Sequence, residues 1–163
     1  MNSSVTIKSI GEMNAFARTV ARSLKGGETL ALTGELGAGK TAFVKGLARA
    51  LGIKNVVQSP TFLLMKCYPV GKNQKPAHQS KSSMRGKPRT DFHALCHVDA
   101  YRIKNERELL TIGLGEHLSD PGTVTAIEWA DLVPELIPKN AIKMKFEHGA
   151  NGKERLVTVT RRA

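Results

Sequence analysis

The string from Gly34 to Thr41, GELGAGKT, constrains this chain more than any other part of its sequence. It matches G-x-x-x-x-G-K-[ST] at every fixed position, a pattern that binds phosphate when a strand precedes it and a helix follows. Residues 28–33 read as a short buried strand. After the string, apolar residues recur at helical spacing: Phe43, Val44, Leu47, Ala48 and Leu51. The context therefore predicts a phosphate-binding turn that opens an α/β unit, rather than a glycine-rich turn with a chance Lys-Thr.

The string has a physical role at each position. Its glycines let the backbone curl so that successive N–H groups point at one phosphate, and the helix adds the positive end of its dipole. Lys40 supplies a charge for the β- and γ-phosphates, and Thr41 offers a hydroxyl to Mg²⁺. The predicted nucleotide-binding residues of the loop are Glu35, Leu36, Gly37, Ala38, Gly39, Lys40 and Thr41.

Such a loop needs an acid at the end of a neighbouring strand to hold the metal ion. Asp99 follows the apolar run 94–98, and Glu128 follows the run 124–127. Spacing alone does not rank them, and either could instead be a helix cap or a surface acid. Thr61 lies where many such proteins carry a threonine that senses the γ-phosphate, although a plain turn beside Pro60 is the simpler interpretation.

The remaining pattern predicts one α/β domain of three layers. We expect a helix over 9–24, strands near 56–57 and 62–68, a short helix over 105–110, and a C-terminal antiparallel hairpin of 142–146 with 156–160. A largely parallel central sheet follows from the alternation of strands and helices. Residues 69–91, with six lysines and arginines against the single acid Asp91, predict a mobile basic loop.

Composition bounds the class of protein. The formal net charge of +11 favours contact with RNA or an acidic protein about as much as it favours plain solubility. Two cysteines, Cys67 and Cys96, argue against a disulfide framework and fit a reducing cytosol. Zinc is disfavoured, because His93 and His97 would share one face of a strand while Cys96 points to the other. No secretory signal and no membrane-length apolar run is evident, so we expect a cytoplasmic protein.

Four strings in this order, GELGAGKT, SPTF, HVDAYR and IEWAD, resemble the TsaE (YjeE) family of bacterial P-loop ATPases. The resemblance runs from about Ile10 to Val159. It implies an ATP-hydrolysing accessory role in making threonylcarbamoyladenosine in tRNA, together with the TsaB–TsaD complex, which would bring tRNA near this chain only indirectly. The transfer itself would belong to TsaD. No arginine that could stabilise the transition state is obvious in the chain, so we expect slow hydrolysis by the chain alone and faster hydrolysis in the partner complex.

The resemblance assigns roles that spacing leaves open. It makes Asp99 the acid near Mg²⁺ and Thr61 a switch-like residue, and it places Glu128 and Trp129 near the nucleotide. Glu128 becomes the candidate for orienting the attacking water, with Asp99 as the alternative. The segment 69–91 is longer and more basic than the corresponding connection in the family. It could contact tRNA or an acidic patch on a partner, or it could be a tolerated surface insertion, which we favour slightly.

Two other functions fit the same loop. A small-molecule kinase would use it to transfer phosphate to an acceptor under an arginine-bearing lid. An RNA-binding module with a vestigial loop would bind tRNA in a salt-sensitive way that ignores Lys40.

Overall fold

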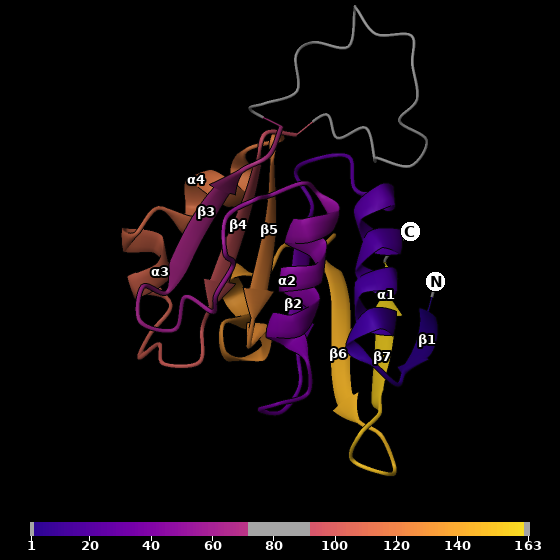
Figure 1. The fold of residues 1–163 in the computed structure, drawn as a ribbon. Coiled ribbons are helices and arrows are strands. Elements are labelled where there is room, and N and C mark those ends of the chain that lie inside the picture. Colours follow the sequence, from indigo (N-terminus) through magenta and orange to yellow (C-terminus); the bar gives the residue numbers. More distant parts are fainter. Residues whose placement is uncertain (1, 72–91, 162–163) are drawn as a thin grey trace, which may run out of the picture.

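The computed structural model describes residues 2–71 and 92–161. They form a seven-stranded sheet of order β1-β7-β6-β2-β5-β4-β3 (Figure 1). The strands are β1 (Asn2–Ile7), β2 (Thr29–Thr33), β3 (Met65–Pro69), β4 (Ala94–Asp99), β5 (Thr123–Glu128), β6 (Ile142–His148) and β7 (Arg155–Thr160). The four central strands β6, β2, β5 and β4 are parallel. The outer strands β3, β7 and β1 each run antiparallel to a neighbour.

Helices cover both faces of this sheet, which gives the expected three layers. The helices are α1 (Ile10–Ser23), α2 (Lys40–Ala50), α3 (Arg107–Thr111) and α4 (Leu114–Ser119), followed by the 3₁₀ turns η1 (Ala130–Leu132) and η2 (Pro134–Leu136). Side chains alternate along a strand, so Leu30 and Leu32 of β2 pack in the core under α1 and α2, whereas Ala31 packs in the opposite core with residues of α3 and α4. The predicted fold class, including the C-terminal hairpin of β6 and β7, is confirmed.

The site is set by where the parallel strands end. β2 leads directly into the glycine-rich loop, β4 ends at Asp99 and β5 ends at Glu128. Asp99 and Glu128 are partners in register, and Leu32 pairs with Glu128 from the other side. Because carboxyl ends of parallel strands meet at one edge of a sheet, the loop and both acids lie together there.

Several local predictions need correction. β1 and α4 were not predicted, and β3 begins only at Met65, since residues 61–64 form a turn. Residues 56–57 belong to no strand. Most of the predicted basic loop, residues 72–91, lies outside the described residues. None of the helices in the described part of the chain is both long and apolar enough to cross a membrane.

The expectation for the cysteines is wrong. Cys67 of β3 and Cys96 of β4 are direct partners across the antiparallel pair, and a disulfide joins them. Their separation of 29 residues along the chain hides this proximity from the sequence. The pairing therefore removes the cysteine-based argument for a reducing compartment.

Candidate functional site

The glycine-rich loop connects β2 to α2 in a conformation that its glycines permit. Gly34, Gly37 and Gly39 all have positive φ. At Gly34 a Cβ atom would lie 2.1 Å from the carbonyl oxygen of Phe146 in β6, so no side chain fits there. Gly39 caps α2 and no side chain caps the first turn. The first N–H groups of the helix are thus open to a ligand, as anion binding at a helix N-terminus requires.

The C-terminal hairpin holds this loop from the side. Nε2 of His148 lies 3.2 Å from the carbonyl oxygen of Leu36, and Nε of Arg155 donates to the carbonyl oxygen of Gly37 at 3.1 Å. These contacts engage carbonyl groups and leave N–H groups of the loop for other partners. Sequence reasoning missed both residues, because they are more than 100 positions from the loop.

Lys40 is the cation of the site. It is only 4% exposed. Its Nζ donates to the carbonyl oxygens of Gly34 and Glu35 and lies 3.8 Å from the centre of the Trp129 ring. Burial lowers the pKa of Lys40, and the nearby carboxylates, Glu128 first among them, act in the opposite direction. A buried ammonium group held by neutral carbonyl oxygens is suited to receive an anionic ligand.

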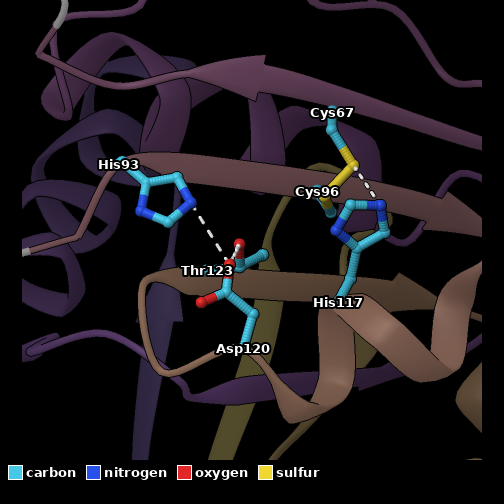
Figure 2. Close-up of a disulfide and its surroundings, with 6 residues drawn as sticks. All are labelled: Cys67, His93, Cys96, His117, Asp120 and Thr123. Atoms are coloured by element: carbon cyan, nitrogen blue, oxygen red, sulfur yellow. Dashed lines mark hydrogen bonds and ion pairs between the residues drawn. A yellow bond between two sulfur atoms is a disulfide. The ribbon is translucent and has the colours of Figure 1, made fainter.

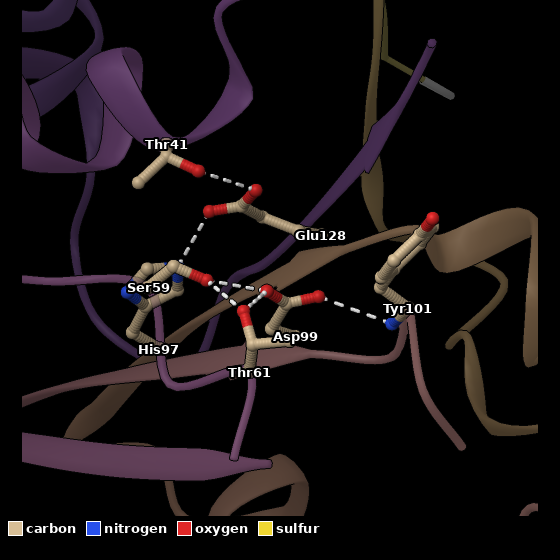
Figure 3. Close-up of polar contacts among 7 residues, drawn as sticks. All are labelled: Thr41, Ser59, Thr61, His97, Asp99, Tyr101 and Glu128. Carbon is tan, nitrogen blue, oxygen red and sulfur yellow. Dashed lines mark hydrogen bonds and ion pairs between the residues drawn. The ribbon is translucent and has the colours of Figure 1, made fainter. Parts of the chain in front are cut away.

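Glu128 lies at the centre of a buried polar cluster (Figure 3). Its Oε2 accepts a hydrogen bond from Oγ1 of Thr41 at 2.8 Å, and its Oε1 lies 2.7 Å from Nε2 of His97. Both side chains of the Glu128–His97 pair are almost completely buried. Thr41 and Glu128, predicted separately, are therefore in direct contact.

His97 is the residue of this cluster that sequence reasoning missed. Its Nδ1 is buried and has no hydrogen-bond partner among the described residues. The tautomer with its proton on Nε2 satisfies the contact with Glu128 and leaves only an unused acceptor at Nδ1. The opposite tautomer would bury an unpaired N–H group, which costs more. We infer that Nε2 of His97 donates to Oε1 of Glu128.

Asp99 is held by the segment that precedes β3 (Figure 3). Its Oδ2 accepts hydrogen bonds from Oγ of Ser59 and, at 2.7 Å, from Oγ1 of Thr61. Its Oδ1 accepts from the backbone N–H of Tyr101 at 3.0 Å. Asp99 and Thr61, predicted separately, are thus in contact, and Ser59 is a third member that was not predicted. The arrangement couples the position of residues 59–61 to this carboxylate.

A cavity of about 470 Å³ opens between these groups. It is lined by Leu36, Gly37, Gly39, Lys40, Thr41, Ala42, Ser59, Thr61, Asp99, Tyr101, Glu128 and Trp129. Trp129 has the unusual φ of 59° for a bulky residue, and its ring packs on Tyr101 with centroids 4.8 Å apart. This backbone conformation turns the ring towards Lys40 at the end of β5.

Two of the predicted loop residues place their side chains in different surroundings. The side chain of Ala38 is fully buried in the core, while Leu36 is 73% exposed at the loop.

His97 contacts Glu128, and Nε2 of His93 pairs with Asp120 at 3.2 Å. The set of His93, His97 and the cysteines considered for zinc does not assemble.

Fold and site together define a class of protein, an α/β domain whose glycine-rich loop lies between a parallel strand and a helix, with two buried carboxylates facing the loop lysine. The sequence profile of the family described as "Threonylcarbamoyl adenosine biosynthesis protein TsaE" matches residues 7–157. The chain belongs to the TsaE family.

Individual relatives agree with this assignment. Proteins named tRNA threonylcarbamoyladenosine biosynthesis protein TsaE are similar to it in Bacillus subtilis (36% identical, 91% of this chain, 79% of the relative) and Streptomyces coelicolor (32%, 91% and 89%). The crystal structure of Bacillus subtilis YdiB superposes with a TM-score of 0.74 at 28% identity, covering 100% of this chain and 87% of that one. The chain is thus a protein of threonylcarbamoyladenosine biosynthesis in tRNA.

Proposed function

We propose that this protein binds and hydrolyses ATP as an accessory of tRNA threonylcarbamoyladenosine modification, acting with the TsaB–TsaD complex in the cytoplasm. The observation that carries the ATPase assignment is the convergence of Lys40, Thr41, Asp99 and Glu128 on one cavity at the mouth of α2. The family supports the pathway, and contact with tRNA would run through the partner complex.

The residues present fit a magnesium nucleotide. The open N–H groups of the loop and α2 would bind the phosphates, and Lys40 would exchange its carbonyl partners for β- and γ-phosphate oxygens. Thr41 would turn its hydroxyl from Glu128 to Mg²⁺, with Asp99 as the nearby acid. Mg²⁺, when bound, supplies charge neutralisation on the phosphate oxygens. Trp129 would flank the nucleotide.

In the proposed reaction a water oxygen attacks the γ-phosphorus and the bond to the bridging oxygen of ADP breaks. Glu128 would orient this water and receive its proton through Oε2, the oxygen that Thr41 vacates. His97 holds the other oxygen, Oε1, and so fixes the direction of the carboxylate. Thr61 would report on the γ-phosphate through its contact with Asp99.

We expect ATP hydrolysis to depend on the partners because the described residues that line the cavity include few cations. Lys40 is its only lysine or arginine among the described residues, and Arg155 donates instead to backbone carbonyls. An arginine that stabilises the transition state raises such rates by about 10³–10⁵-fold. We therefore expect slow hydrolysis by the chain alone and faster hydrolysis with TsaB–TsaD.

The test is phosphate release from Mg-ATP, measured with and without TsaB–TsaD, for the wild type and Lys40→Ala. We expect slow release that the partners stimulate and that the variant loses. Equal, fast rates with and without partners would refute partner dependence. Transfer of phosphate to an added acceptor in place of water would support the kinase alternative, and tRNA binding indifferent to Lys40→Ala without any hydrolysis would support the RNA-binding alternative.

A further inference from the structure

The disulfide between Cys67 and Cys96 lies beside His117 of α4 (Figure 2). Cys96 alternates with Leu95 and His97, so its side chain points towards α4, away from the nucleotide-type cavity. His117 of α4 reaches the pair, with its Nε2 3.5 Å from Sγ of Cys67. The two sulfurs and a ring nitrogen of His117 all lie within 4.8 Å of one another.

The two sulfurs differ in access. Cys96 is fully buried on a strand flanked on both sides. Cys67 lies on the edge strand β3 and is partly open to solvent. A thiolate from solution can therefore reach the sulfur of Cys67, and the sulfur of Cys96 is the one that leaves.

The imidazole of His117 completes a reactive arrangement. A histidine beside a cysteine can take the proton of the thiol and return it, which favours the thiolate that exchanges disulfides. Structural disulfides need no such group. In the cytoplasm, the location proposed above, the disulfides that do occur are usually transient or redox-sensing.

We propose that Cys67, Cys96 and His117 form a reversible thiol–disulfide site that reacts with low-molecular-weight thiols and disulfides at Cys67. In reduction, a small thiolate attacks Sγ of Cys67, the bond to Cys96 breaks, and Cys96 leaves as a thiolate. A second small thiolate attacks the mixed disulfide and releases Cys67. The protein disulfide gains two electrons, two small thiols become one small disulfide, and their two protons pass to the protein thiols, with His117 serving Cys67. Oxidation by a small disulfide is the reverse.

The site crosslinks two strands that lead to the candidate functional site. Residues 62–64 connect Thr61 to β3, and β4 continues from Cys96 to its end at Asp99. The backbone N–H of Asp99 donates to the carbonyl oxygen of Leu64 at 2.9 Å, just before β3. The redox state thus determines whether the strand after Thr61 is joined to the strand of Asp99 covalently or by hydrogen bonds alone.

Trapping with glutathione disulfide tests the site in the folded full-length protein. Cys96→Ser leaves the accessible sulfur of Cys67, and we expect one glutathione adduct at that residue by mass spectrometry. Cys67→Ser leaves only the buried sulfur of Cys96, and we expect at least about tenfold slower labelling. Equal labelling of the two variants, or faster labelling of Cys67→Ser, would overturn the proposal.

The second measurement compares the wild type with two variants, each of which lacks one histidine. Without denaturant, excess reduced glutathione should expose both thiols and excess glutathione disulfide should remove them. His117→Gln should slow both steps by at least about tenfold, whereas His93→Gln, whose histidine pairs with Asp120, should not. A disulfide that opens only in denaturant, thiols that cannot be reoxidised, or equal rates in the two histidine variants would refute the site. None of these readouts depends on ATP hydrolysis.

Discussion

At the scale of single residues, His97 is the least expected member of the site. It is fully buried on β4 and contacts one oxygen of Glu128 while Thr41 contacts the other. A carboxylate held by two donors keeps one orientation, whereas one that loses a buried partner must turn or attract a proton. His97 is therefore a positioning residue that acts through Glu128.

Two substitutions separate this role from simple packing. His97→Leu removes the donor and should lower kcat for ATP by about 10–100-fold, with the affinity for Mg-ATP, measured by Trp129 fluorescence, changed far less. His97→Gln keeps an amide donor that can reach Glu128 and should recover most of the rate. Both proteins would be compared by thermal melting.

A double variant tests whether His97 acts through Glu128. If it does, His97→Leu should cost little further activity once Glu128→Gln is present. Additive losses, or no rescue by glutamine, would contradict the positioning role.

At the scale of elements, the glycine-rich loop depends on how closely β2 and β6 approach each other. A Cβ atom at Gly34 would lie 2.1 Å from the carbonyl oxygen of Phe146, and the residue also has a φ of 131°. Gly34→Ala should therefore lower the free energy of unfolding by more than about 2 kcal/mol, since backbone strain and overpacking add.

Gly52 gives a matched control for that variant. Its φ of 79° is also positive, but an added Cβ atom would meet nothing within 4 Å. Gly52→Ala should cost only the conformational strain, about 1–2 kcal/mol. Denaturant unfolding measures the free energy of unfolding of both variants. Equal decreases in this free energy would mean that the contact with β6 does not constrain the loop.

The helices and strands also show which structural features a local sequence pattern can predict. Buried central strands such as β2 and β5 were predicted within about one residue, because their apolar runs are continuous. β1 was missed because, of its six residues, only Ile7 is buried, so no alternation signals it. α4 was missed because it is short and begins between Gly113 and Gly115.

The same distinction between local pattern and long-range contact applies to the predictions for the site. The loop and the acids at strand ends follow from local pattern, because the edge of a parallel sheet collects them. The contacts of His97 with Glu128, Arg155 with Gly37, and Cys67 with Cys96 depend on strand order and register. No local spacing in the sequence indicates these three contacts.

At the scale of the whole molecule, exposed apolar side chains lie beside the candidate site. Phe62 is 85% exposed and Leu63 is 66% exposed in the turn just after Thr61, and the Arg102 guanidinium lies 4.6 Å from the centre of the Phe62 ring. Exposed aromatic and aliphatic neighbours with an arginine are typical of protein interfaces. We expect TsaB–TsaD to dock on this turn.

Combined replacement of Phe62 and Leu63 by alanine should raise the concentration of TsaB–TsaD needed for half-maximal stimulation of ATP hydrolysis by at least about tenfold. The slow rate of the chain alone should stay unchanged. Leu110→Ala, at a 49% exposed position on α3, is the control. Unaltered stimulation of the double variant would exclude this turn from the docking surface.

The account as a whole depends on whether the loop and Lys40 hold a triphosphate. Isothermal titration of the protein with Mg-ATP should give one saturable binding event. Lys40→Ala, checked by melting to be folded, should weaken it by at least about tenfold, because the buried ammonium group is lost. No saturable heat with the wild type, or the same affinity in the variant, would contradict the assignment.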